Sequence, residues 1–139
     1  MSRIVRFRGR FQCSADGARR ARKLVVNFAT TWLAGDELVG LELACGEALA
    51  NCVEHGGGPI LAVDCWCADE SLTVEIRHQG RGFEPPQAVQ APPRGALRGY
   101  GLFIMHQVLD DVEFLEGGRG LRLRKNLPVR LPGVDGRPD

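Results

Sequence analysis

The sequence lacks any long apolar run. No stretch reaches the roughly 20 apolar residues that a membrane-spanning helix needs, and the basic first residues are not followed by an apolar segment of signal-peptide length. It also lacks a strong net charge, because 18 basic and 17 acidic side chains leave a formal charge of +1. A chain with so little net charge has no overall electrostatic field that would attract nucleic acid or an anionic membrane. We therefore expect a soluble cytoplasmic protein that binds neither directly.

The sequence has no C-x-x-C pair. Its five cysteines are odd in number, which fits neither a disulfide framework nor a zinc ribbon. Cys65 and Cys67 are spaced to lie on the same face of one strand, but no histidine cluster accompanies them, so packing is favoured over metal binding. This use of cysteine is typical of a reducing compartment.

The composition that remains is that of an ordinary globular domain. Of the 139 residues, 44% are hydrophobic and 25% are charged, and a chain of this size forms one domain with a conventional core. The last segment is rich in glycine, proline and charge. We expect a single domain over residues 1–127 and a flexible tail over 128–139.

Apolar periodicity predicts the order of the elements. A strand in which apolar residues stand among arginines comes first, and we expect it to be either a strand with one exposed face or an edge strand. In chain order, we expect a strand at 3–12, a helix at 15–34 capped by Ser14, a helix from an Asp36 cap to Gly56, strands at 59–68 and 71–77, a proline-rich loop at 84–98, a helix at 102–109, and strands at 112–116 and 120–127. This order does not alternate as βαβ units do. It predicts an α+β fold, a two-layer sandwich with a mostly antiparallel mixed sheet and helices on one face.

Three polar residues of the second predicted helix share one stripe. Glu47, Asn51 and His55 are spaced by four, so their side chains are expected along one face. Taken alone, such a stripe is most simply a solvated polar surface. The hypothesis that the stripe is a functional site needs support from elsewhere in the chain.

Two segments, each with a pair of glycines two residues apart, supply that support. His78-Gln79-Gly80-Arg81-Gly82-Phe83 follows a predicted strand, and Arg98-Gly99-Tyr100-Gly101-Leu102 opens a predicted helix. Glycine lets backbone approach a ligand closely, and the free N–H groups at a helix start bind phosphate. Taken alone, either segment could equally well be an ordinary turn and not a ligand-binding loop.

Together and in this order, these motifs resemble the asparagine box and the first two glycine boxes of the gyrase, heat-shock chaperone, histidine-kinase and mismatch-repair (GHKL) superfamily. The resemblance covers about residues 5–126 and implies the Bergerat-type ATP-binding fold. The segments 47–56 and 99–105 look most like the anti-sigma serine/threonine kinases, which act by partner switching. A detached histidine-kinase ATP domain is a less favoured relative, because no phosphoaccepting helix is present.

The resemblance implies roles for individual residues. Asn51 would hold Mg²⁺ through its amide oxygen, and Glu47 would be the catalytic base that takes the proton of a partner's serine hydroxyl. His55 is expected to be a structural or capping group. The implied ATP-binding set is Asn51, His78, Gly80, Gly82, Phe83, Gly99, Tyr100, Gly101 and Leu102. The implied partners are a sigma factor and a STAS-type anti-anti-sigma protein, and a homodimer is suggested by analogy.

His78 departs from the family pattern, which has an aspartate there to read the adenine amino group. Strand alternation predicts that His78, and not Gln79, points into the pocket. A neutral imidazole can accept one hydrogen bond, whereas a carboxylate has two acceptor oxygens and can bind a water as well. The sequence therefore leaves two functions open, which are a serine kinase with weakened ATP binding and a non-catalytic adaptor of the same fold.

Overall fold

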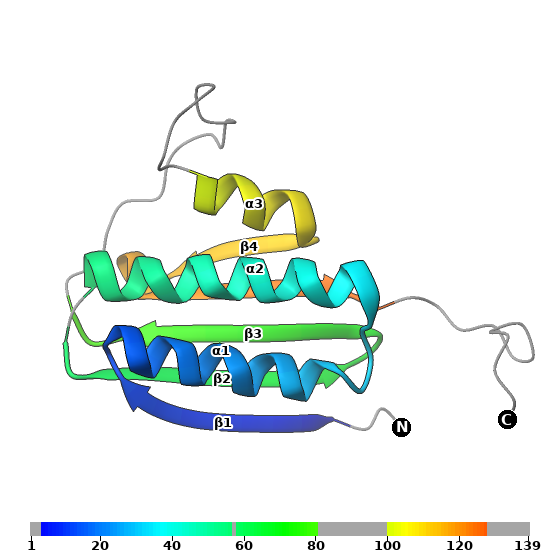
Figure 1. Ribbon diagram of the computed structural model, residues 1–139, viewed down its shortest axis with the longest axis horizontal. Coiled ribbons are helices and arrows are strands. Elements are labelled where there is room, and N and C mark those ends of the chain that lie inside the picture. The colour runs from blue at the N-terminus through cyan, green and yellow to red at the C-terminus, as the bar shows by residue number, and fades with distance from the viewer. Residues whose placement is uncertain (1–3, 57, 81–99, 128–139) are drawn as a thin grey trace, which may run out of the picture.

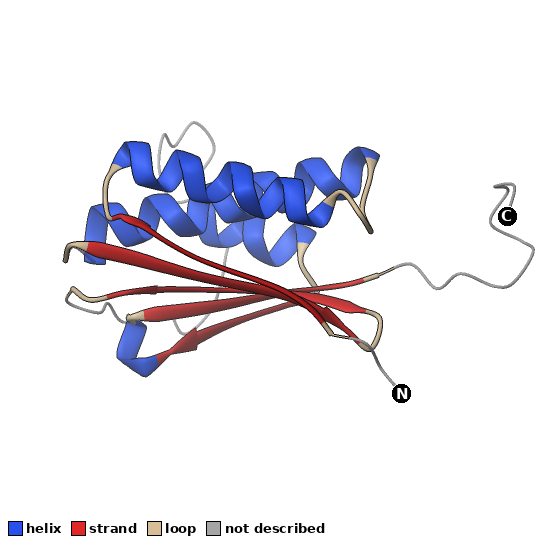
Figure 2. Cartoon of the chain, turned by 90° about the horizontal axis from the view of Figure 1, so that it is seen from below, coloured by secondary structure: helices blue, strands red, loops and turns tan. Residues whose placement is uncertain are grey.

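The computed structural model describes residues 4–56, 58–80 and 100–127 and forms a two-layer sandwich. A five-stranded sheet in the order β1-β2-β3-β5-β4 is antiparallel at every described pairing. The helices α1, α2 and α3 lie side by side on one face of it (Figures 1 and 2). The elements are β1 (Val5–Gln12), α1 (Ala15–Ala29), α2 (Gly35–Asn51), the π-helix η1 (Cys52–Gly56), β2 (Ile60–Ala68), β3 (Ser71–His78), α3 (Tyr100–Val108), β4 (Asp111–Leu115), the 3₁₀ turn η2 (Glu116–Gly118) and β5 (Gly120–Asn126). The predicted α+β class is confirmed, and the predicted tail at 128–139 lies outside the described residues.

Helix α1 begins where its sequence predicts and ends earlier. Ser14 is the N-cap, and its Oγ accepts a hydrogen bond from the N–H of Gly17 at 3.1 Å. The helix ends at Ala29, five residues before the predicted end at 34, although Thr30 itself keeps helical backbone angles (φ −60°, ψ −19°). The Thr30 hydroxyl donates to the carbonyl of Asn27 at 2.6 Å, a local bond of the kind that competes with a regular helix.

Helix α2 starts without the predicted cap. Ala34 occupies the N-cap position and makes no side-chain hydrogen bond, so the prediction of Asp36 as the cap is wrong. Asp36 and Glu37 lie in the first turn instead. Their charges stabilise that end of the helix through its dipole.

The predicted hairpin between β2 and β3 is confirmed. Its two-residue turn consists of Asp69 and Glu70, both with positive φ (52° and 69°). Turns of this kind match the right-handed twist of the strands that they join. The hairpin fixes a register in which every second residue of β3 faces the helices.

The core lies between the helices and the covered face of the sheet. Its largest fully buried side chains are Val25, Leu41, Leu49, Leu61, Leu72, Val74, Ile76, Met105 and Leu123. Cys65 and Cys67 are buried in this core, which agrees with a packing role. Burial raises the pKa of the Cys52 and Cys65 thiols to about 12, so both are protonated and unreactive at neutral pH. None of the helices in the described ranges combines the length and apolarity needed to cross a bilayer.

The opposite face of the sheet is built from ion pairs. Glu75 is only 6% exposed although no helix covers it, because two arginines enclose it. The guanidinium groups of Arg77 and Arg122 each donate to its carboxylate at 2.6 Å. Arg122 also donates to the Glu113 carboxylate at 3.3 Å, so this row of ion pairs continues onto the neighbouring strand β4.

Two helix glycines predict opposite effects on stability. A Cβ at Gly17 would clash with the carbonyl oxygen of Gln12, whereas one at Gly46 would meet only the flexible side chain of Arg22. We expect Gly17→Ala to lower the free energy of unfolding by about 1–3 kcal/mol through overpacking. Gly46→Ala should raise it by about 0.5–1 kcal/mol through helix propensity. Urea unfolding of both variants measures the difference, and equal stability would contradict the packing of β1 against α1.

Candidate functional site

The elements that carry the described part of the predicted site meet at one end of the sandwich. Figure 1 shows the end of α2, the turn η1, the end of β3 and the start of α3 at the same side of the molecule. Gly40 near the start of α2 lies against Val108 at the end of α3, since a Cβ there would be 3.2 Å from the Cβ of Val108. The two helices are therefore antiparallel, and the last turns of α2 lie beside the first turn of α3.

Glu47 and Asn51 lie on the side of α2 that faces α3. Positions 47 and 51 of a helix lie within roughly 20° of position 40 around the axis, and Gly40 contacts α3. Both side chains are half-buried. The structure thus places a carboxylate and an amide one turn apart, directed towards the N-terminus of α3.

Helix α2 changes type immediately after Asn51. Residues Cys52–Gly56 form a π-helix, a feature that often marks functional sites. Cys13 donates a weak Sγ hydrogen bond of 3.8 Å to the carbonyl of Cys52 and so helps to satisfy the altered turn. The four-residue repeat of an α-helix does not continue through this segment. The side chain of His55 lies outside the described part of the structure.

Gly58 joins the end of η1 to the first glycine box. Its φ is +83°, and a Cβ there would lie 2.9 Å from the backbone nitrogen of Gly80 and 3.0 Å from the carbonyl carbon of Gln79. Only glycine fits such a close approach of two backbones. This contact fixes the end of the asparagine-bearing helix relative to Gly80. Apart from the run of glycines at 56–58, no feature of the sequence predicts this contact.

The second glycine box is only partly described. Tyr100, Gly101 and Leu102 form the first turn of α3, where backbone N–H groups have no partner within the helix. Their side chains are outside the described atoms. Gly82, Phe83 and Gly99 also lie outside the described residues.

His78 is the last residue of β3 and is 5% exposed, whereas Gln79 is exposed. The prediction that His78 is the inward-pointing residue is confirmed. Its Nε2 lies 3.2 Å from the carbonyl oxygen of Gly118 in η2, and its backbone N–H donates to the carbonyl of Arg119 at 3.0 Å. Both bonds attach the end of β3 to the loop between β4 and β5.

The bond to Gly118 determines what the other ring nitrogen can do. A carbonyl oxygen only accepts, so Nε2 must carry the hydrogen, and Nδ1 of the neutral ring is then an acceptor. This Nδ1 is buried and has no hydrogen-bond partner within the described residues. An unsatisfied buried acceptor costs about 1–3 kcal/mol. A donor from a bound molecule would remove that cost.

These groups fit a magnesium nucleotide. The asparagine amide oxygen is a hard donor suited to Mg²⁺, which is usually held by few protein groups together with phosphate oxygens. No group of three or more His, Cys, Asp or Glu residues in the described ranges could hold a metal unaided. The N-terminus of α3 suits phosphate, and His78 Nδ1 suits an amino group.

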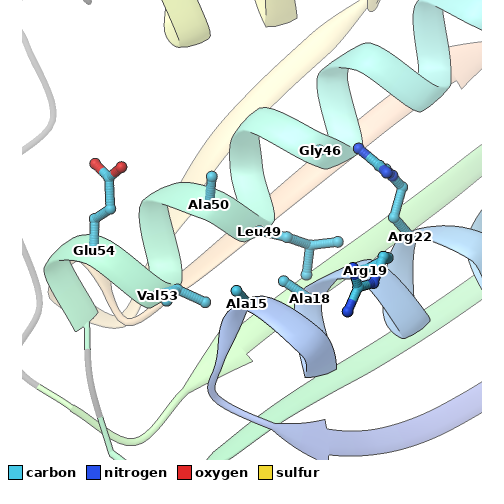
Figure 3. A pocket seen from close by; sticks show the side chains of 9 residues that line it. All are labelled: Ala15, Ala18, Arg19, Arg22, Gly46, Leu49, Ala50, Val53 and Glu54. Carbon is cyan, nitrogen blue, oxygen red and sulfur yellow. The ribbon is translucent and has the colours of Figure 1, made fainter.

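A separate hollow lies between α1 and α2 (Figure 3). It has a volume of about 350 Å³ and contains none of the predicted site residues. Its lining residues are Ala15, Ala18, Arg19, Arg22, Gly46, Leu49, Ala50, Val53 and Glu54. They lie on a different side of α2 from Glu47 and Asn51, so this hollow is not part of the candidate nucleotide site.

Comparison with known proteins identifies one family. The family model described as the histidine kinase-like ATPase domain matches residues 11–125. The match includes α2, the end of β3 and the start of α3, which carry the site. A comparison with curated proteins gives no match.

The hydrogen bond to Gly118 predicts one tautomer for His78. Nitrogen-15 NMR of the ligand-free protein at a pH where the ring is neutral should show a protonated Nε2 and an unprotonated Nδ1. His106, which is exposed on α3, serves as the control and should show the averaged signals of a solvated imidazole. A protonated Nδ1 on His78 would contradict the bond and the acceptor role together.

Proposed function

This chain belongs to the histidine kinase-like ATPase domain family, and from that premise we propose that it is an ATP-dependent protein serine kinase of the anti-sigma type. The observation that supports this proposal best is the position of Glu47 and Asn51. They lie one turn apart and half-buried on the face of α2 that looks towards the start of α3. A site that only bound nucleotide would need the amide and have no chemical use for the carboxylate.

Nucleotide binding would use groups from three elements. Asn51 would bind Mg²⁺ through its amide oxygen, and the N–H groups of Tyr100, Gly101 and Leu102 would donate to phosphate oxygens. His78 Nδ1 would accept a hydrogen bond from the adenine amino group. Gly80, whose position is fixed by its contact with Gly58, would border the base.

Glu47 would act as the general base. Bound Mg-ATP supplies the γ-phosphoryl group. The Glu47 carboxylate would take the proton of a partner's serine hydroxyl while that oxygen bonds to the γ-phosphorus. The bond from the γ-phosphorus to its bridging oxygen breaks, and ADP leaves.

The partner classes rest on the resemblance of segments 47–56 and 99–105 to anti-sigma kinases. We propose that the protein sequesters a sigma factor and phosphorylates a small STAS-type anti-anti-sigma protein in the cytoplasm. Phosphorylation would then decide which partner is bound.

One observation favours a second function, that of a non-catalytic adaptor. The bond of 3.2 Å from His78 to Gly118 links β3 to η2 within the protein itself. The histidine therefore has a structural use where the family has a carboxylate that reads adenine. An adaptor of this fold would keep the bond and bind ATP weakly or not at all.

Calorimetric titration with Mg-ATP separates these two functions. The native protein should bind. Asn51→Ala should weaken binding by roughly tenfold or more, because a ligand of the metal is lost. His78→Asp should tighten it by roughly tenfold or more, since a charge-assisted hydrogen bond replaces a neutral one. Gln79→Asp adds the same charge at the adjacent exposed position and should leave affinity within about twofold.

The three outcomes of this titration have different meanings. Binding by the native protein supports the kinase. Binding by His78→Asp alone identifies an adaptor that has lost its adenine acceptor. If neither binds and both remain folded by circular dichroism, the nucleotide site itself is refuted.

A phosphotransfer assay tests the role of Glu47. With Mg-ATP and a STAS-type partner, Glu47→Gln should lower the rate of phosphoserine formation by roughly 100-fold or more, because the base is lost. Mg-ATP affinity should be nearly unchanged. Glu42→Gln, an exposed position of the same helix, is the matched control. Phosphate on a partner histidine, or an unchanged rate in Glu47→Gln, would refute the proposed mechanism.

A further inference from the structure

Strand β1 presents a long unpaired edge. It is the first strand in the sheet order and pairs with β2 without interruption from Val5↔Cys67 to Gln12↔Ile60. No strand of the described ranges covers its other side (Figure 1). The N–H and C=O groups on that side can pair with another extended chain.

The side chains of β1 give this edge a strong charge. Arg6, Arg8 and Arg10 alternate along the strand, so all three lie on the sheet face that the helices leave uncovered. Asp64 accepts from Arg6 at 2.9 and 3.0 Å and from Arg8 at 3.3 Å. Arg10 has no hydrogen bond or ion pair to any described residue. Asp64 thus pairs with two of the three guanidinium groups in this row.

A hollow adjoins the same edge on the helix side. It has a volume of about 420 Å³ between β1 and α1. Its lining residues are Arg10, Phe11, Arg20, Lys23, Leu24 and Asn27. Phe11 and the 38% exposed Leu24 supply apolar surface, while Arg10 and Lys23 supply charge that no carboxylate in the described ranges neutralises.

From this arrangement we propose that the outer edge of β1 binds an extended segment of a partner protein in which acidic and apolar side chains alternate. The segment pairs with β1 through its backbone, as in β-strand addition. Its acidic side chains lie along the arginine row, and its apolar side chains face Phe11 and Leu24. The proposal is independent of the nucleotide chemistry, because none of these residues belongs to the candidate nucleotide site.

A second copy of this chain is a poor occupant of the edge. In-register antiparallel pairing of β1 with itself about Arg8 sets Arg8 against Arg8 and Arg6 against Arg10. Like charges directly opposite each other destabilise a strand pair. The arginine row therefore selects against self-pairing and for an acidic strand.

Binding of model peptides tests this proposal directly. The probe is a fluorescein-labelled octapeptide of alternating glutamate and valine, followed by anisotropy with the full chain. It should bind, and affinity should fall with added salt. A lysine–valine octapeptide should bind at least roughly tenfold more weakly. The glutamate–valine peptide N-methylated at alternate residues keeps its side chains and loses one hydrogen-bonding edge, so it should be weakened to a similar degree.

Charge reversal in the protein supplies the matched control. Arg8→Glu combined with Arg10→Glu should weaken the acidic peptide by roughly tenfold or more and strengthen the lysine–valine peptide. Arg22→Glu reverses one charge on α1, on the side facing α2 and away from β1, and should leave both affinities within about twofold. Mg-ATP titration of the same variants should be unchanged, which separates this proposal from the nucleotide site.

Several results would overturn the proposal. The first is that the acidic peptide does not bind. The second is that the double variant binds it as tightly as the native protein does, and the third is that the N-methylated peptide binds as tightly as the unmethylated one. A protein dimer whose amide-exchange protection maps to β1 would also overturn it, because the edge would then belong to a second copy.

Discussion

The candidate site depends on how closely helix α2 packs on the sheet. Ala44, Cys45 and Ala48 are all fully buried beneath it, and such small side chains let the helix approach the strands. Glycines do the same at its flanks, where Gly40 meets Val108 of α3 and Gly46 meets Arg22 of α1. An element held on three sides has little freedom to shift. Its remaining half-buried side chains, including Glu47 and Asn51, are therefore positioned by packing alone.

That rigidity extends to the end of the sheet through backbone contacts. The π-helix after Asn51 brings the chain to Gly58, which touches the backbone of Gly80, while His78 is tied to Gly118. The first link is a close approach of two backbones at a glycine with positive φ, and the second joins the His78 ring to a backbone carbonyl. The Asn51 amide and the His78 imidazole thus belong to one connected frame, although they come from different layers of the sandwich.

The sequence predicts the parts that depend on local periodicity. Alternation along β3 was enough to show that His78 is buried and Gln79 exposed, and the four-residue spacing was enough to place Glu47 beside Asn51. It does not predict the π-helix, because the apolar pattern of α2 continues into Cys52 without a break. Nor does it predict the contact of Gly58 with Gly80 or the bond from His78 to Gly118, since these join segments whose approach is set by the fold as a whole.

His78 stands where the family has an aspartate, and its two ring nitrogens have different roles. Nε2 has a structural bond that explains why a polar ring is tolerated at the end of a buried strand face. It does not explain Nδ1, which is buried and has no hydrogen-bond partner in the part of the chain that the structure describes. Buried polar atoms without partners are uncommon in folded proteins and concentrate where a ligand or water completes them. The structural bond also fixes the tautomer, so the free nitrogen can only accept. A pocket with one fixed acceptor at this position suits an amino group better than a carbonyl, and this distinction favours adenine over a base that presents oxygen there.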